Sequence, residues 1–273
     1  MFWEASLTLI MPDYDDYQSS FHTAFAPELA QLVAMLPRTG RVIDVPCGRG
    51  FYTRLLARHL QTGTLTAVDA CEDSLPPLRA ALADATTESA VLKADAYHLP
   101  FADAAFDTLW CAESLISLEP PRALREFIRV LAPGGIAAVL EVDEFHHVLL
   151  PWPVELEAAL PRALLKATRQ KHGSGIKHSP ARRLRAWLNE AGFRAVRRRL
   201  LPLERVTPFD EPTQAFLRHH LEYLRSFARP HLSEAHQTLF DRAADPEAAA
   251  SIVRKTDVEL TLMLALYHAR KPA

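Results

Sequence analysis

Acidic side chains and glycines stand together where two apolar runs of the sequence end. The first run ends at Asp44 and leads through Gly48 and Gly50 into a helical pattern; the second ends at Asp69, 21 residues after Gly48. Glycine allows a tight turn in which a ligand approaches backbone N–H groups closely. An acid at this spacing is typical of a carboxylate that binds both hydroxyls of a ribose. The pattern indicates a nucleotide-like ligand, and the alternative is a plain strand-to-helix turn without one.

The residues around this turn restrict the ligand further. Thr53 stands where dinucleotide-binding turns have a third glycine that packs the helix against the strand, so a pyrophosphate fits poorly. A carboxylate at Asp44 would repel phosphate groups and attract an ammonium group. A ligand with a ribose, no phosphate and a cationic amino-acid tail is S-adenosylmethionine. A nicotinamide oxidoreductase is a further alternative, and both Thr53 and Asp44 count against it.

Short apolar runs alternate with helical patterns along most of the chain. Strands of four to seven residues that alternate with amphipathic helices indicate βαβ units and a parallel sheet in an α/β fold. We expect strands at 41–45, 64–68, 90–93, 106–110, 136–142, 193–206 and 259–268, and helices at 51–60, 74–83, 121–131 and 180–191. Helical patterns at about 145–178 and 207–256 interrupt the alternation. Insertions of this kind are lids, walls of a binding site, or structural covers.

Five segments in this order carry a family resemblance: 42–50, 66–69, 93–101, 106–111 and 131–135. They resemble the motifs of class I S-adenosylmethionine-dependent methyltransferases, and among these the small-molecule group that includes the quinone-biosynthesis C-methyltransferases. The resemblance is close over residues 40–142 and looser over 179–206. It implies a Rossmann-like, seven-stranded, mostly parallel sheet with helices on both faces, an antiparallel last strand and helical insertions.

The resemblance also implies which residues bind the cofactor, S-adenosylmethionine, and how the chain is divided. The methionine end would lie against Asp44, Gly48 and Gly50, the ribose against Asp69, the adenine against Asp95 and Ala96, and the amino group near the backbone of Cys111. Residues 1–40 would form a helical segment that covers the cofactor site. Residues 41–273 would form the core with its two helical lid insertions.

Departures from the family pattern are informative as well. Pro46 stands where the first motif usually has its first glycine; proline fixes φ and has no N–H, so the pocket is expected to be slightly reshaped. No Asn/Asp-Pro-Pro-aromatic sequence follows the fourth strand, which argues against methylation of amino groups on bases or on glutamine. The sequence has no Asp-Asn pair of the kind that would indicate a metal-dependent catechol enzyme. The adjacent His146 and His147 have no third ligand at metal spacing, so we expect no metal.

Methyl transfer from a sulfonium requires few catalytic groups from the protein. The methyl group is already activated, so the chain chiefly positions donor and acceptor and excludes water. A base is needed only where the acceptor loses a proton. The candidates are Glu113, at the end of the fourth strand, and His146, after the fifth. The alternatives are an exposed loop acid and a surface histidine.

Composition and charge exclude several classes of partner. The net charge is −2, which gives no strong field for nucleic acid or an anionic membrane, and no apolar run reaches the roughly 20 residues of a membrane span. The three cysteines form no CxxC pair, and we expect no signal peptide and a cytoplasmic location. The expected function is methyl transfer to a small, apolar or aromatic acceptor by a monomer or homodimer. The alternative is a non-catalytic S-adenosylmethionine-binding protein of the same fold.

Overall fold

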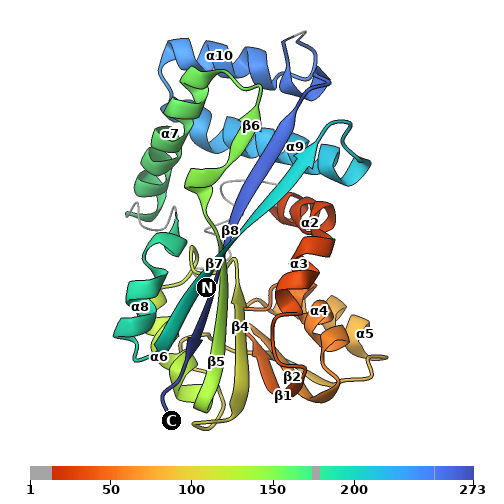
Figure 1. The fold of residues 1–273 in the computed structure, drawn as a ribbon, viewed down its shortest axis with the longest axis vertical. Helices are drawn as coiled ribbons and strands as arrows, with labels where there is room; N and C mark the ends of the chain where they lie inside the picture. The colour runs from red at the N-terminus through yellow and green to blue at the C-terminus, as the bar shows by residue number, and fades with distance from the viewer. Residues whose placement is uncertain (1–13, 174–178, 249) are drawn as a thin grey trace. The chain divides into compact units, whose positions relative to one another are not determined.

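A computed structural model describes residues 14–173, 179–248 and 250–273 of the chain (Figure 1). The chain divides into two compact units, each built from three segments. The core unit comprises Pro27–Val142, Pro180–Leu201 and Leu264–Ala273. The helical unit comprises Met1–Ala26, Asp143–Ser179 and Pro202–Met263, of which 1–13 and 174–178 lie outside the described residues.

The core unit is built on a parallel sheet whose strand order is β3-β2-β1-β4-β5. The strands are β1 (Thr39–Asp44), β2 (Thr62–Asp69), β3 (Glu88–Lys93), β4 (Phe106–Ala112) and β5 (Leu131–Val142). Neighbours in this order pair in parallel, and β5 then pairs antiparallel with β8 (Glu259–Arg270) from Ile136↔Arg270 to Val142↔Leu264. The order reverses at β1, and in open α/β sheets ligands bind outside the carboxyl ends of the strands at such a reversal.

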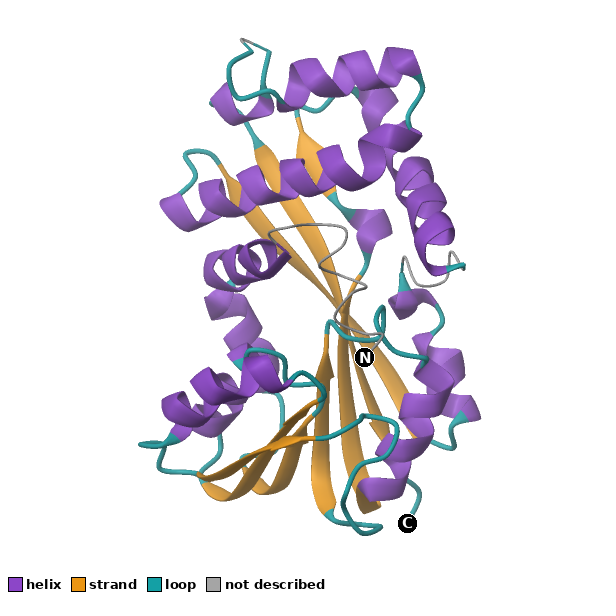
Figure 2. Ribbon diagram, turned by 180° about the vertical axis from the view of Figure 1, so that it is seen from behind, coloured by secondary structure: helices purple, strands orange, loops and turns teal. Residues whose placement is uncertain are grey.

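Helices cover both faces of this sheet, as Figures 1 and 2 show. On one face lie α3 (Ala26–Val33), α4 (Phe51–His59) and α5 (Leu75–Leu82), and on the other α6 (Pro120–Val130) and α8 (Leu184–Glu190). Helix α6 begins with two prolines, which fit a first turn because its N–H groups have no intrahelical acceptor. Its apolar face is buried in full at Leu124 and Phe127.

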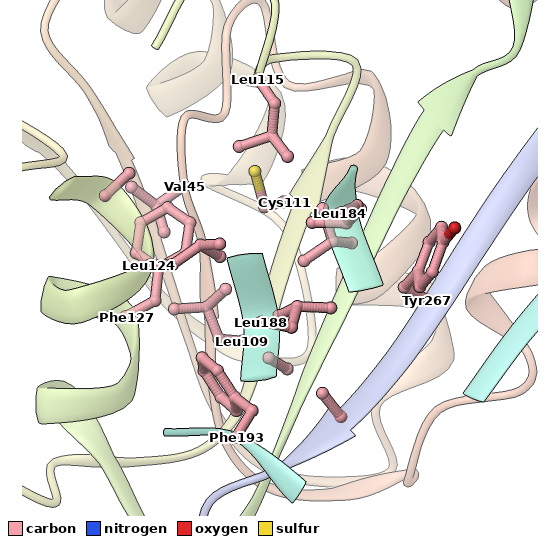
Figure 3. Packing of buried hydrophobic residues seen from close by; sticks show 14 of the residues in the cluster. Val45, Leu109, Cys111, Leu115, Leu124, Phe127, Leu184, Leu188, Phe193 and Tyr267 are labelled. Carbon is pink, nitrogen blue, oxygen red and sulfur yellow. The ribbon is translucent and has the colours of Figure 1, made fainter. Parts of the chain in front are cut away.

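Figure 3 shows the apolar cluster that joins β4, α6 and α8 in the core unit. Leu109, Phe127, Leu188 and Phe193 are fully buried there. Burial of each such side chain contributes roughly 1.5–3 kcal/mol, so this cluster fixes β4 firmly beneath the residues that follow it. Cys111 points into the same cluster, which leaves only its backbone for any role at the end of the strand.

The helical unit has a separate apolar core. Its helices are α2 (Tyr14–Ala24), α7 (Val154–His172), α9 (Glu211–Tyr223) and α10 (Glu234–Ala244), and a π-helical turn follows α9 at Leu224–Ala228. Trp152, Leu156 and Phe240 are among the buried residues of this core. Ring contacts of Tyr17 and Phe21 with Phe216 hold α2 against α9.

The α/β fold class predicted from the sequence is confirmed, with corrections in detail. The sheet has eight strands in the described residues rather than seven, because β6 (Val148–Leu150) pairs antiparallel with the start of β8 inside a segment expected to be helical. A three-residue strand before a proline has too little periodicity to be recognised. Strand β7 (Arg194–Val206) pairs with β8 outside the main strand order. Among the described residues, no helix is long and apolar enough to cross a membrane.

Candidate cofactor and methyl-transfer site

The turn after β1 is held by backbone hydrogen bonds. Cys47 N–H donates to Val68 O at 2.8 Å and Gly50 N–H to Cys47 O at 2.9 Å, so the chain after Pro46 stays tied to β2. Gly48 and Gly50 have φ of +50° and +77°, values that glycine adopts without strain. A Cβ at Gly48 would meet no atom within 4 Å, whereas one at Gly50 would lie 2.3 Å from Leu78 Cδ1. Gly48 therefore borders open space, and Gly50 is required by packing.

This difference gives a stability prediction. Gly50→Ala should lower the free energy of unfolding by roughly 2–4 kcal/mol, because it adds overpacking against the fully buried Leu78 to the cost of a positive φ. The matched control is Gly134→Ala: Gly134 has φ +75°, and a Cβ there would meet no atom within 4 Å, so only the backbone cost of roughly 1 kcal/mol is expected. Urea unfolding measures both, and equal losses would contradict the packing role of Gly50.

Asp69 ends β2 and organises the turn from the neighbouring strand. Its Oδ2 accepts a hydrogen bond from Gly48 N–H at 2.7 Å and its Oδ1 accepts one from Cys71 N–H at 2.9 Å. The side chain is buried, which raises its pKa, while these backbone donors act to lower it. Each carboxylate oxygen has a second lone pair, so the same group can also accept from ribose hydroxyls. The spacing that singled out Asp69 thus brings it directly to the glycine turn.

Asp44 lies at the carboxyl end of β1 and is almost fully buried. Thr53 Oγ1 donates to its Oδ2 at 2.6 Å, which explains why a hydroxyl stands where a dinucleotide-binding turn has glycine. Burial raises the pKa of Asp44 to about 7, against the lowering effect of the Thr53 hydrogen bond. Among the described residues no Lys, Arg or His forms an ion pair with Asp44. A cation bound there would favour the ionised carboxylate.

Glu113 follows β4 and is hydrogen-bonded to a tyrosine of α4. Tyr52 Oη donates to Glu113 Oε1 at 2.5 Å, and the Tyr52 ring packs against Trp110 of β4. Glu113 has φ +53°, a strained conformation for a non-glycine residue, and its N–H donates to Leu140 O. Strain of this kind costs of order 1–3 kcal/mol and clusters at functional sites. Tyr52 was not predicted as a site residue; its place two positions after Gly50 is the signal that the sequence carries.

Glu141, near the end of β5, is a second acid that the sequence reasoning missed. Its Oε1 accepts from Leu115 N–H at 2.9 Å and from Ser114 N–H at 3.2 Å, so it holds the loop that begins at Glu113. Burial raises the pKa of Glu141 to about 8, the negative charge of Glu113 raises it further, and the two backbone donors lower it. The available signal was a single glutamate in the otherwise apolar run 136–142.

The residues expected to bind adenine follow β3. Asp95 Oδ1 accepts from Tyr97 N–H at 2.9 Å, and its Oδ2 lies 3.5 Å from Nδ1 of His98. The Asp95 side chain is 53% exposed, so it remains accessible to a ligand, while Ala96 is buried. Ala94 N–H donates to Asp69 O, and this bond ties the loop after β3 to the end of β2. Asp95 and Asp69 therefore lie on adjacent strand ends, as the motif order requires.

His146, the other candidate base, belongs to the helical unit. Its Nδ1 lies 2.9 Å from Asp143 Oδ2, and Ser179 Oγ donates to Asp143 Oδ1 at 3.3 Å. Asp143 is buried, whereas the His146 side chain is 53% exposed. A carboxylate that holds Nδ1 orients the imidazole ring. Glu113 and His146 thus stand in different units, each with its own orienting partner.

The residues of the core unit fit the cofactor that the family resemblance implies. Gly48 leaves open space that a side chain would fill, and the buried carboxylates of Asp44 and Glu141 form no ion pair among the described residues. A ligand with an ammonium group and a sulfonium supplies the missing positive charge. The described residues contain no group of three or more His, Cys, Asp or Glu side chains placed to hold a metal ion.

Known proteins resemble this chain chiefly over the residues that form the site. The profile of a family described as "Methyltransferase domain" matches residues 43–139, the segment from β1 to β5. The 27-O-demethylrifamycin SV methyltransferase of Amycolatopsis mediterranei is 29% identical over 95% of this chain and 88% of its own length. The ubiquinone/menaquinone biosynthesis C-methyltransferase UbiE of Ralstonia pickettii is 33% identical over 41% of this chain and 51% of its own. Several curated relatives match over only 37 to 51% of their own length.

A solved structure extends the likeness beyond the core. The [4+2]-cyclase SpnF is 26% identical, with a TM-score of 0.52, and the match covers 91% of this chain and 82% of that one. The curated matches, the methyltransferase profile and the strand order agree with the ordered motifs in the sequence. These findings identify a class I S-adenosylmethionine-dependent methyltransferase domain in residues 43–139 of the chain.

Proposed function

We propose that this enzyme transfers the methyl group of S-adenosylmethionine to a small acceptor that is apolar or aromatic. The observation that carries the proposal is the hydrogen bond from Gly48 N–H to the buried Asp69, which joins the turn after β1 to the end of β2. Asp44 lies at the carboxyl end of β1, directly before this turn. The relatives named for quinone and rifamycin methylation support a small organic acceptor.

We infer a division of roles among the residues of the core unit. The cofactor, when bound, supplies an activated methyl group for in-line displacement. Asp44 would hold the ammonium end, Gly48 would give close approach to the backbone, and Asp69 would fix the ribose. Asp95 and the Ala96 N–H would bind the adenine. Gly50 supports the turn by packing, and Cys111 contributes only its backbone.

Glu113 is the base that the core unit offers to an acceptor that must lose a proton. Tyr52 Oη donates to one of its oxygens and thereby fixes the carboxylate beside the end of β4. Glu141 acts through the backbone of residues 114–115 as a positioning residue for this loop. His146, oriented by Asp143, is the corresponding base of the helical unit.

A specific observation favours a second candidate function. One solved relative that covers most of this chain is named for a [4+2] cyclisation, not for methyl transfer. A protein of this fold that binds S-adenosylmethionine without transferring its methyl group is therefore the competing proposal, since fold does not determine activity. Turnover separates the two, because only methyl transfer releases S-adenosylhomocysteine.

The test combines cofactor binding with turnover. Asp69→Ala removes the acceptor of two backbone N–H groups, and calorimetry should find S-adenosylmethionine affinity lowered by roughly 5- to 150-fold, equivalent to about 1–3 kcal/mol. Wild-type enzyme incubated with a library of small phenols and quinones should release S-adenosylhomocysteine, and Asp69→Ala should release less. Unchanged affinity in Asp69→Ala would refute the cofactor assignment. Tight binding with no release from any acceptor would favour the non-methylating alternative.

A further inference from the structure

The helical unit contains a cavity of about 480 Å³ whose lining includes none of the residues assigned to methyl transfer. The chain before α9, the helix α9 itself and the residues after α10 line it, and all of these belong to the segment Pro202–Met263 of this unit. Pockets for small molecules in proteins measure roughly 300–1,000 Å³. The cavity therefore has room for a small organic ligand.

Part of the cavity wall is apolar. Leu217 and Ile252 are almost fully buried, and Phe209 and Val253 are half-buried and pack against the same apolar core of the unit. A wall of this kind is covered most favourably by an apolar part of a ligand, because such a contact removes apolar surface from water on both sides. The ligand that fits this part of the cavity has an apolar body.

Two basic side chains line the same cavity, Arg218 of α9 and Lys255. Arg218 is exposed and Lys255 is half-buried, so a ligand in the cavity is accessible to both. Within the described part of the chain, neither side chain forms an ion pair, and no Asp or Glu lines the cavity. The cavity thus combines an apolar wall with two positive charges.

Other cations of the helical unit have acidic partners. Arg229 lies 2.6 Å from a carboxylate oxygen of Asp241, and Arg254 lies 2.9 Å from one of Glu247. Arg254 directly precedes Lys255, so Glu247 is already paired with the neighbouring residue. Unpaired positive charges that line one cavity attract an anionic group, which would accept charge-assisted hydrogen bonds from them.

The start of α9 shows which anionic group fits. Backbone N–H groups at a helix N-terminus commonly bind phosphate, but here Asp210 Oδ1 accepts from Thr213 N–H at 3.0 Å and places a negative charge at that end. The donors that remain are a guanidinium, whose paired N–H groups match the two oxygens of a carboxylate, and an ammonium. This donor set favours a carboxylate over a phosphate.

We propose that this cavity binds a small organic carboxylate whose apolar body lies against Leu217 and Ile252. The carboxylate accepts hydrogen bonds from Arg218 and Lys255, and these two residues select an anion over an uncharged ligand. The site is separate from the cofactor and acceptor sites of the proposed function and does not depend on them.

The test uses two probes of nearly the same shape on the full chain. 4-Phenylbutyrate carries a carboxylate, and its amide, 4-phenylbutanamide, has the same apolar body without the charge. Calorimetry or ligand-observed NMR should find that wild type binds the carboxylate roughly tenfold more tightly than the amide. Raising the salt concentration from roughly 0.05 to 0.5 M should reduce this preference, because salt screens the attraction between accessible charges.

Variants of the two cations test their role. Arg218→Met and Lys255→Met keep an aliphatic side chain and remove the charge, so each should lower the affinity for 4-phenylbutyrate roughly five- to tenfold and leave that for the amide unchanged. Lys255→Arg keeps the charge and should keep the preference. Arg242→Met, at an exposed residue of α10 outside the cavity, is the matched control and should change neither affinity.

A further pair of variants tests the location. Val253→Phe adds volume to the cavity wall and should weaken binding of both probes, whereas Val154→Phe, on α7 and 72% exposed, should leave both affinities unchanged. Thr256→Trp, at an exposed lining residue, serves the same purpose if thermal unfolding finds Val253→Phe unfolded.

Three results would overturn the proposal: equal affinities of wild type for the carboxylate and the amide, no binding of 4-phenylbutyrate, or a preference that survives loss of both cations. Tighter binding of 3-phenylpropyl phosphate than of 4-phenylbutyrate would contradict the choice of a carboxylate. Release of S-adenosylhomocysteine by a protein that does not bind 4-phenylbutyrate refutes this site alone and leaves the methyl transfer standing.

Discussion

Replacing Glu113 by glutamine is expected to lower kcat by roughly 10²- to 10⁴-fold on an acceptor that loses a proton, the usual contribution of a positioned general base. Glutamine keeps the shape of the side chain and can still accept the hydrogen bond from Tyr52 Oη, so the loop after β4 should stay in place. The loss would then come from the missing proton acceptor. Initial rates of S-adenosylhomocysteine release measure the effect.

Three further variants identify the base. Tyr52→Phe should lower kcat by a smaller factor because it removes only the group that orients Glu113. Glu190→Gln, an exposed acid on α8, is the control and should leave the rate unchanged. If His146→Asn loses activity and Glu113→Gln retains it, the base belongs to the helical unit instead.

The second large effect is a pH dependence of cofactor affinity that depends on Asp44. Because burial raises the pKa of Asp44 to about 7, the cofactor-free carboxyl is mostly protonated at pH 6 and mostly ionised at pH 8. A cationic ligand binds the ionised form, so affinity for S-adenosylmethionine should rise roughly tenfold between pH 6 and pH 8. Asp44→Asn should bind roughly 5- to 150-fold more weakly at pH 8 and lose most of this dependence. Calorimetry at pH 6, 7 and 8 measures both.

The same group has the opposite effect on the stability of the cofactor-free protein. A folded-state pKa raised from 3.8 to about 7 means that the folded chain holds a proton which the unfolded chain releases. Stability should therefore fall as pH rises from about 4 through 7, and Asp44→Asn should remove this part of the loss.

The control for the binding prediction is Asp103→Asn, at a side chain that is 78% exposed. This variant should keep the wild-type dependence of cofactor affinity on pH. A wild-type affinity that is flat from pH 6 to 8 would refute an ionic role for Asp44.

The parallel core was predictable from the sequence because its signals are local. Each strand from β1 to β5 is a short apolar run, and acids and glycines mark the ends of β1 and β2, so Asp44, Gly48 and Asp69 could be assigned to one edge of the sheet. The hydrogen bond between Gly48 and Asp69 follows from that topology. The missed residues depend on tertiary packing. Glu141 reaches the loop after β4 only because β4 and β5 are neighbours, a pairing that one glutamate in an apolar strand does not reveal.

Other features required the structure for a different reason. Gly50 looked like part of a ligand-binding turn, yet the closest obstacle to a side chain there is Leu78, on a helix 28 residues further along. Cys111 was expected to contribute its backbone near the amino group of the cofactor, and only the structure shows that its side chain lies in the apolar core. A sequence pattern can identify a position where a larger or charged side chain would be unfavourable. It does not show whether a neighbouring helix or a bound ligand makes that side chain unfavourable.

The last strand has a consequence for how the chain folds. Residues 264–270 of β8 pair with β5 in the core unit, and residues 259–261 pair with β6 in the helical unit, so both pairings wait for the same late segment. During synthesis β1 to β5 can pair with one another as they emerge, β4 with β1 included, but β5 keeps an open edge until β8 has emerged. An open strand edge is a template for aggregation, and closing so long a loop is slow. Chaperone dependence should therefore be greatest for chains released before residue 259.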